Sequence, residues 1–242
     1  MDAFFRKFFP EDNDVMQAFH TEVDQQLPEQ GALLDLGCGD LRAVAPYRRG
    51  GRTVWGSDFE THPRLTEPQW FRPLRADGGI PFADAQFDVV TGIWVLEHIA
   101  KPAAFCQEVS RVLRPGGRFI GLSIDGRHYV SWLTRLFRAL PHEVTQQIVY
   151  RLYGRLPHDT HPTHYRLNTP WQLQRAARSA GLRVAEVRHF ANPDYFSFCR
   201  PLRKAAIVAD WLLTHLSTGL GKIYFVTTLE KPTLAGRRRS AA

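Results

Sequence analysis

A chain of 242 residues with 44% hydrophobic and 23% charged residues has the composition of one ordinary globular domain. No apolar run approaches the ~20 residues of a bilayer span, and three cysteines without metal-ligand spacing argue against a disulfide framework. The formal charge of +7 fits an anionic partner, and a solvated basic surface explains it equally well. We expect a cytoplasmic protein without a secretory signal.

The first predicted element is a helix over residues 12–27. Val15, Phe19, Val23 and Leu27 recur there at helical spacing. This spacing gives the helix one apolar face, which we expect to pack on the domain.

An apolar strand over residues 33–36 then runs into a glycine turn. Gly37 and Gly39 allow a sharp turn and a close approach of the backbone to a ligand. A dinucleotide-binding turn needs a third glycine three positions after the second, and that position holds Arg42. The Asp35 carboxylate would also repel a pyrophosphate. The turn therefore favours a cationic ligand over a dinucleotide.

Strands and helices alternate from this turn to about Asp125. A second strand over residues 52–58 ends in a carboxylate, and an acidic, glycine-containing loop covers residues 74–82. Another strand starts at residues 87–90, and a glycine turn within 113–119 leads into the next one. Such alternation predicts a parallel sheet with helices on both faces.

In this order, the segments resemble the motifs of the class I S-adenosylmethionine (SAM) methyltransferases. The closest likeness is to the subgroup that methylates small molecules, lipids and sugars. The matches cover roughly residues 30–125, and their order is more specific than any single motif. The resemblance implies a doubly wound, Rossmann-like α/β fold with SAM as the cofactor. Its seven-stranded sheet would be mostly parallel with an antiparallel last strand, and would carry helical insertions after strand five and before strand seven.

The resemblance also assigns the cofactor contacts by position. Asp35 would orient the ammonium of SAM, Asp58 would accept hydrogen bonds from both ribose hydroxyls, and Asp77 would accept from the adenine amino group. Trp94 would wall the pocket near the methyl donor, with a core position as the alternative. The predicted cofactor-binding set is Asp35, Gly37, Gly39, Asp58, Asp77, Gly78 and Trp94.

No metal site is expected. In one quinone-methylating branch of the family, a pair like Glu97-His98 belongs to a metal site with another Glu three residues earlier. That position is Trp94, which cannot ligate a metal, so packing or capping of the following helix is the favoured role of His98. His158 and His161 also precede His164 at metal-like spacing, but acidic partners are missing.

The C-terminal half of the chain continues the fold. Thr169-Pro170 predicts a helix start and Gly181 its end. Strands are expected over residues 182–190 and 222–229, as strands six and seven of the family's sheet.

Two stretches interrupt the alternating pattern. Residues 126–168 are basic, amphipathic and rich in histidine, and residues 194–221 separate the last two strands. We expect both to be insertions for substrate recognition or a lid within a single domain over residues 1–234. Residues 235–242 are expected to form a basic, disordered tail.

Histidines after the fifth strand are the candidates for a general base. Methyl transfer to a hydroxyl needs removal of a proton, and the pKa of histidine suits that task. His164 is the first candidate because a structured helix start follows it, and His128 is the second because it comes directly after the fifth strand. The alternative is that both are loop histidines with surface roles.

The predicted function is transfer of a methyl group from SAM to a small-molecule, glycan or lipid-linked acceptor, with oxygen preferred. A nucleic-acid methyltransferase is the second interpretation, supported by charge but lacking a base-flipping motif after the fourth strand. An inactive SAM-fold scaffold is the third, and it gives no reason for the acids at 35, 58 and 77.

Three segments mix aromatic, leucine and basic residues. They cover residues 4–9, 132–138 and 203–216. Basic amphipathic helices bind anionic membranes peripherally, and helices that cover an active site show the same pattern. The pattern favours core or lid packing, with peripheral membrane contact as the alternative.

Overall fold

The computed structural model describes residues 2–12, 14–65, 67–137, 162–216 and 220–233, together with positions 144, 147, 150 and 151. Within these residues, six strands form one sheet in the order β2-β1-β3-β4-β6-β5. The strands are β1 (Ala32–Leu36), β2 (Thr53–Ser57), β3 (Phe87–Ile93), β4 (Leu113–Ile124), β5 (Arg183–Phe190) and β6 (Tyr224–Glu230). β1 pairs in parallel with β2 and β3, and β3 with β4, whereas β6 runs antiparallel to both β4 and β5. The predicted α/β class and the antiparallel last strand are confirmed.

The described residues form six strands where the resemblance implies seven. Between β2 and β3 the chain makes only one isolated bridge, from Phe71 to Gly56. Arg72 N–H then donates to the Gly56 carbonyl at 3.0 Å, so the segment follows β2 for a short distance. Pro68 and Pro73 flank it and lack N–H donors, which prevents a continuous ladder.

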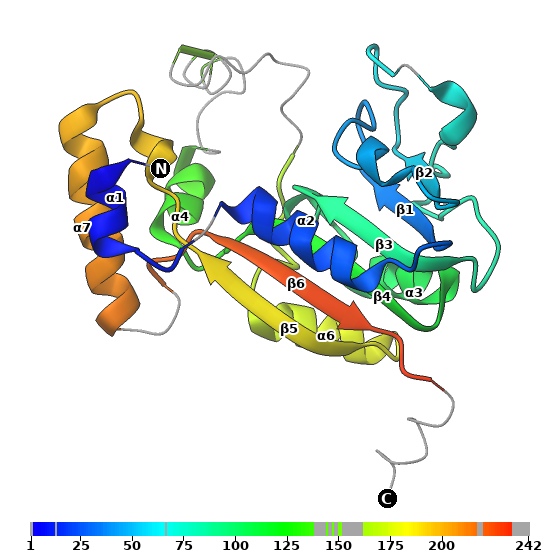
Figure 1. Ribbon diagram of the computed structural model, residues 1–242. Helices are drawn as coiled ribbons and strands as arrows, with labels where there is room; N and C mark the ends of the chain where they lie inside the picture. The colour runs from blue at the N-terminus through cyan, green and yellow to red at the C-terminus, as the bar shows by residue number, and fades with distance from the viewer. Residues whose placement is uncertain are drawn as a thin grey trace, which may run out of the picture.

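Helices cover both faces of the sheet, as the alternating pattern predicted (Figure 1). α2 (Val15–Gln26) packs on β4 and β6 from one side, while α3 (Pro102–Val112) and α6 (Pro170–Ser179) contact each other on the opposite side. Asp14 begins α2 by accepting hydrogen bonds from Met16 and Gln17 N–H.

The predicted ends of α6 are confirmed. The Thr169 hydroxyl accepts from Gln172 N–H at 3.2 Å, and Pro170 occupies the first helical position. Gly181 follows the helix with a φ of +70°, a conformation that glycine adopts without strain.

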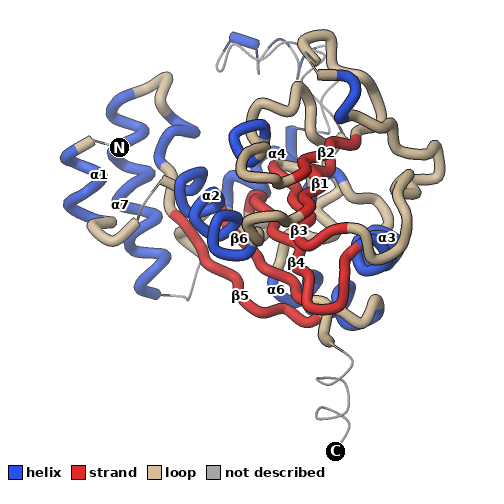
Figure 2. Tube along the Cα trace, turned by 45° about the vertical axis from the view of Figure 1, so that its right-hand side comes forward, coloured by secondary structure: helices blue, strands red, loops and turns tan. Residues whose placement is uncertain are grey.

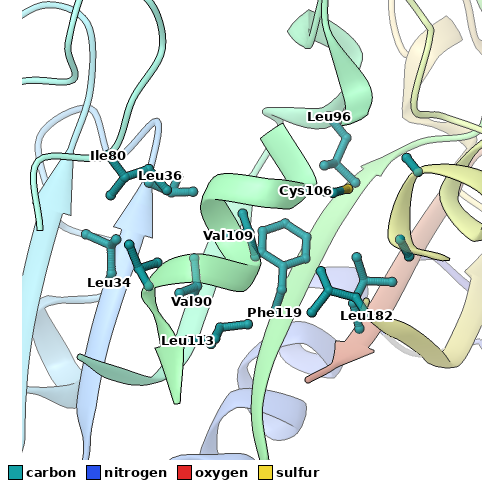
Figure 3. Close-up of a cluster of buried hydrophobic side chains, with 14 of the residues drawn as sticks. Leu34, Leu36, Ile80, Val90, Leu96, Cys106, Val109, Leu113, Phe119 and Leu182 are labelled. Atoms are coloured by element: carbon teal, nitrogen blue, oxygen red, sulfur yellow. The ribbon is translucent and has the colours of Figure 1, made fainter. Parts of the chain in front are cut away.

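Each face of the sheet has its own apolar core. On the α3 side, Leu34 and Val90 from the strands meet Val109 from α3 and Phe119 from β4 (Figure 3). On the α2 side, Phe19 and other residues of that helix pack on β1 and its neighbours. These two cores fix the carboxyl ends of β1, β2 and β3 relative to one another, and that edge is where an open α/β sheet binds its ligand.

A third, smaller cluster joins the N-terminus to the predicted second insertion. α1 (Ala3–Phe8) packs against α7 (Arg200–Leu216) through Phe5, Phe9 and Ile207. Figure 2 shows α1 and α7 as a pair set beside the sheet. The first predicted insertion starts with α4 (Tyr129–Phe137), whereas most of 138–161 and the tail from 234 onward lie outside the described residues.

None of the helices that the structure describes is long and apolar enough to cross a membrane.

Candidate functional site

The glycine turn after β1 is packed on one side and open on the other. Gly37 and Gly39 have φ values of +65° and +49°, which favour glycine. A Cβ on Gly37 would lie 2.5 Å from Val95 Cγ2, whereas a Cβ on Gly39 would have no atom within 4 Å. Gly37 N–H donates to the Ser57 carbonyl at 2.8 Å. The turn is therefore hydrogen-bonded to the end of β2, and at Gly39 its backbone remains accessible to a ligand.

Asp58 lies directly beside this turn. Its Oδ2 accepts from Gly39 N–H at 3.2 Å, and its Oδ1 accepts from Phe59 N–H at 2.7 Å. Each oxygen of an ionised carboxylate keeps further lone pairs, so the group can still accept two hydroxyl hydrogen bonds. The adjoining Phe59 side chain is 62% exposed and offers a flat apolar surface next to the carboxylate.

Asp35 is buried inside β1, with 2% of its surface exposed. The Thr91 hydroxyl donates to its Oδ1 at 2.7 Å. Burial raises the pKa of Asp35 to about 7, partly offset by the Thr91 hydrogen bond and reinforced by the nearby Asp58 charge. A positively charged ligand at this edge of the sheet would favour the ionised form of Asp35.

Asp77 and Gly78 form a tight turn between Arg75 and Gly79. Arg75 and Gly79 are joined by a backbone hydrogen bond, and Asp77 Oδ1 accepts from Gly79 N–H at 2.8 Å. The Asp77 side chain is 78% exposed. Gly78 has a φ of +87°, and a Cβ there would have no atom within 4 Å. Leu74 N–H donates to the Asp58 carbonyl at 2.8 Å, which brings the start of this loop to the end of β2.

Trp94 follows β3 in a left-handed conformation, with a φ of +57°. Its backbone N–H donates to the Leu122 carbonyl, and its ring centroid lies 4.8 Å from that of Tyr224. Tyr195 in turn lies 5.9 Å from Tyr224. The next residue, Val95, packs on Gly37, and Trp94 and Tyr224 both border the apolar core that includes Cys38 of the glycine turn. Sequence analysis missed the two tyrosines, which come from distant segments.

The segment that contains His164 is hydrogen-bonded to the short 3₁₀ helix η3 (Leu96–His98). His164 and Tyr165 N–H both donate to the Glu97 carbonyl, at 2.6 and 3.1 Å. His98 Nδ1 lies 2.8 Å from the Pro162 carbonyl, so His98 also contacts this segment. The His164 side chain itself is exposed.

Glu97 also fixes the segment through its side chain. Its buried carboxylate accepts from the Ser123 hydroxyl, and Ser123 accepts from Asn168 Nδ2 at 2.8 Å. Asn168 Nδ2 also donates to the Ile124 carbonyl at 3.0 Å. This network ties residues 162–168 to the carboxyl end of β4, so His164 has a structured support.

His128, by contrast, is buried away from solvent. It is 2% exposed, and its Nε2 lies 3.3 Å from Asp210 Oδ1 without the alignment of a hydrogen bond. Val130 N–H donates to His128 Nδ1, which leaves the proton of a neutral ring on Nε2, facing Asp210. In this structure His128 joins α4 to α7, and of the two candidate bases only His164 is exposed.

The described residues contain no group of three or more side chains arranged to hold a metal. His158 and His161 lie outside the described residues.

The chemistry of the donor set fits SAM. A buried carboxylate, an unobstructed glycine turn and a second carboxylate on that turn meet at one edge of the sheet, and no phosphate-binding glycine follows. A methyltransferase-domain family model matches residues 34–121. Ubiquinone biosynthesis O-methyltransferase of Maricaulis maris is 30% identical over 191 residues, which cover 74% of this chain and 70% of that relative. The chain belongs to the class I SAM-dependent methyltransferases.

Other members of this family support the assignment. The ubiquinone biosynthesis O-methyltransferase of Paracidovorax citrulli is 29% identical over 177 residues, covering 69% of each chain. Two further relatives of that name are matched over 64% and 68% of their length.

Solved methyltransferase structures share the fold. A SAM-dependent methyltransferase from Methanosarcina mazei has a TM-score of 0.56 at 20% identity, covering 88% of this chain and 97% of that one. Geranyl diphosphate C-methyltransferase from Streptomyces coelicolor has a TM-score of 0.56 at 14% identity, covering 89% and 74%. The methyltransferase fold and SAM as cofactor agree with the expectations from the sequence.

Proposed function

We propose that this methyltransferase transfers the methyl group of SAM to a hydroxyl of a small aromatic acceptor that carries an apolar tail. The main structural support is the aromatic group of Trp94, Tyr195 and Tyr224 beside the glycine turn, which suits a flat ring. Relatives named for O-methylation in ubiquinone biosynthesis support oxygen as the acceptor atom and a quinone precursor as the acceptor class.

We propose the following roles for the side chains around SAM. When bound, SAM supplies a methyl group on a positively charged sulfur. Asp35 faces the ammonium, Asp58 accepts from the ribose hydroxyls, and the Asp77–Gly78 turn contacts the adenine. His164 takes the proton of the acceptor hydroxyl as the oxygen–carbon bond forms and the carbon–sulfur bond breaks. The products are a neutral methyl ether and a neutral thioether, and protonated His164 returns its proton to water.

The two insertions have a proposed role in binding the acceptor. Residues 126–168, which include α4, and residues 194–221, which include α7, would recognise the acceptor within one domain over residues 1–234. An apolar tail would keep the acceptor in a bilayer, so we propose that the enzyme contacts the membrane peripherally rather than crossing it.

The test is an acceptor screen with SAM that carries a trideuterated methyl group. Catechols with and without a prenyl tail are compared with the matching anilines and with RNA, and the products are identified by mass spectrometry. We expect one labelled methyl on a catechol oxygen, with the tailed catechol preferred. Transfer to RNA, or to the aniline nitrogen in preference to oxygen, would contradict the proposal, and Asp58→Ala serves as the low-activity control.

A further inference from the structure

The outward face of α7 is apolar along its whole length. The buried side of the helix carries Ala206, Ile207 and Asp210. On the opposite side an apolar strip runs along the helix, formed by the exposed residues Pro201, Leu202, Ala205, Ala209, Leu212 and Leu216, with exposed bases along one edge only. Leu202, Leu212 and Leu216 are 42%, 46% and 81% exposed. A surface helix normally turns a polar face to water, so this face indicates a missing partner.

The same region holds half of the other large apolar side chains that are exposed among the described residues. Among the described residues, eleven large hydrophobic side chains are exposed, and seven of them lie on α4, on α7 or just before α7. Besides the three leucines of α7, they are Trp132, Leu133, Leu136 and Phe198. The buried pair of His128 and Asp210 connects the start of α4 to α7. We call the exposed apolar and basic side chains of α4, of α7 and of Phe198 the cap surface.

The exposed charges of α4 and α7 themselves are of one sign, and the two exposed carboxylates beside α7, Asp2 and Asp194, are paired with Arg203 of that helix. α4 contains no acidic residue, and the single acid of α7, Asp210, is 3% exposed. Arg200, Lys204 and His215 are exposed along one edge of the apolar face of α7. Lys204 Nζ lies 5.3 Å from the ring centroid of Phe4, which extends the basic edge to α1.

We propose that the cap surface rests on an anionic lipid bilayer, with α7 lying flat in the interface. Amphipathic helices with basic edges bind such surfaces by burying their apolar face while their bases meet lipid phosphates. A second copy of the chain fits less well, because two such faces would bring bases together without an exposed acid on either α4 or α7. A lid role would not use this face either, since α7 already packs inward through Ile207.

This inference names the membrane-contacting surface within the proposed function. The candidate base, His164, is connected to α4, because the hydroxyl of the next residue, Tyr165, hydrogen-bonds to Thr134 of α4 at 3.0 Å. A cap surface seated on the bilayer would therefore bring a lipid-tailed acceptor to the cofactor edge of the sheet.

Vesicle flotation of the full chain tests the proposal. The probes are vesicles of phosphatidylcholine alone and of phosphatidylcholine with phosphatidylglycerol, at low and high salt. We expect binding to the anionic vesicles only, with release as salt rises. Leu212→Gln/Leu216→Gln should weaken binding about tenfold or more by removing apolar surface. Arg200→Glu should weaken it about tenfold by reversing a charge near the lipid.

Matched controls lie on α6, away from the cap surface. Trp171→Gln removes an exposed aromatic side chain, and Arg178→Glu reverses the charge of an exposed side chain. Both variants should bind vesicles like wild type. Circular dichroism and SAM affinity show whether each variant is folded.

Two results would overturn the inference. The first is equal vesicle binding by folded Leu212→Gln/Leu216→Gln and wild type. The second is absence of vesicle binding at low salt, including the case of a dimer that the same leucine changes dissociate. Wild type separates this inference from the proposed function, because vesicle binding by a wild-type protein that methylates no catechol oxygen would refute only the latter. Asp58→Ala should bind vesicles normally although its SAM binding is weakened.

Discussion

Replacing Asp35 by asparagine should stabilise the protein in the absence of SAM and weaken its binding of SAM. Asp35 is a buried carboxyl whose pKa is raised to about 7 by burial and by the neighbouring Asp58. Asparagine has nearly the same shape, can accept the Thr91 hydrogen bond, and carries no charge at any pH. The variant therefore isolates the contribution of the negative charge.

The sign of the pH dependence follows from proton linkage. Between the unfolded pKa of 3.8 and the folded value of about 7, the folded chain holds more protons than the unfolded chain. The stability of wild type therefore falls as pH rises through this window, by an upper limit of about 4 kcal/mol, since each pKa unit is worth about 1.4 kcal/mol. Asp35→Asn avoids this loss. We expect it to be more stable than wild type by about 2–4 kcal/mol at pH 8, with the difference vanishing toward pH 4.

Thermal unfolding of SAM-free protein from pH 4 to pH 8 measures the stability difference, and calorimetry measures SAM binding in parallel. Wild type should bind SAM more tightly as pH rises toward 8, because the ionised carboxylate attracts the ammonium, whereas the Asp35→Asn variant should lack this component of the pH response. Asp84→Asn, at an exposed carboxylate, serves as the matched control. A stability difference that does not change with pH, or an Asp35→Asn variant less stable than wild type at pH 8, would refute the reasoning.

Four further predictions follow, three for single residues and one for the metal requirement. Asp58→Ala should weaken SAM binding by about 1.5–3 kcal/mol through loss of two ribose contacts, and equal affinities by calorimetry would remove Asp58 from the site. His164→Ala should lower kcat by about 10²–10⁴ with SAM affinity unchanged. A kcat within a few-fold of wild type for His164→Ala would disprove the base assignment. His128→Ala should instead lower the free energy of unfolding by about 1–3 kcal/mol, because Asp210 loses its buried neighbour. Turnover should be indifferent to EDTA, and loss of activity that magnesium or zinc restores would show that a metal is required.

The elements that local patterns specify were predictable. Gly37, Gly39 and Asp58 follow strand ends, and the carboxyl ends of neighbouring parallel strands meet at one edge, so their proximity follows from the order of elements. Thr169 and Gly181 mark the ends of α6 because capping depends on residues within one turn.

Contacts between residues that are far apart in the sequence could not be predicted from such local patterns. His128 comes directly after β4, where an open site was expected, but α7 brings Asp210 against it and closes the position. Tyr195 joins the aromatic group around Trp94 only because η5 (Pro193–Phe196) and the start of β6 converge. The strand that the resemblance implies between β2 and β3 is another case. Its absence from the described residues was predictable, because Pro68 and Pro73 stand in the sequence and argue against a full ladder.

The placement of β6 has a consequence for how the chain is made. Of the strands that the structure describes, β6 leaves the ribosome after all the others, yet it separates β4 from β5 in the sheet. β1 to β4 can pair as soon as they emerge, whereas β5 has no strand to join until Tyr224–Glu230 is synthesised. Translation that stops before β6 would release a nascent chain with two strand edges unpaired, at β4 and β5, which invites aggregation or chaperone capture.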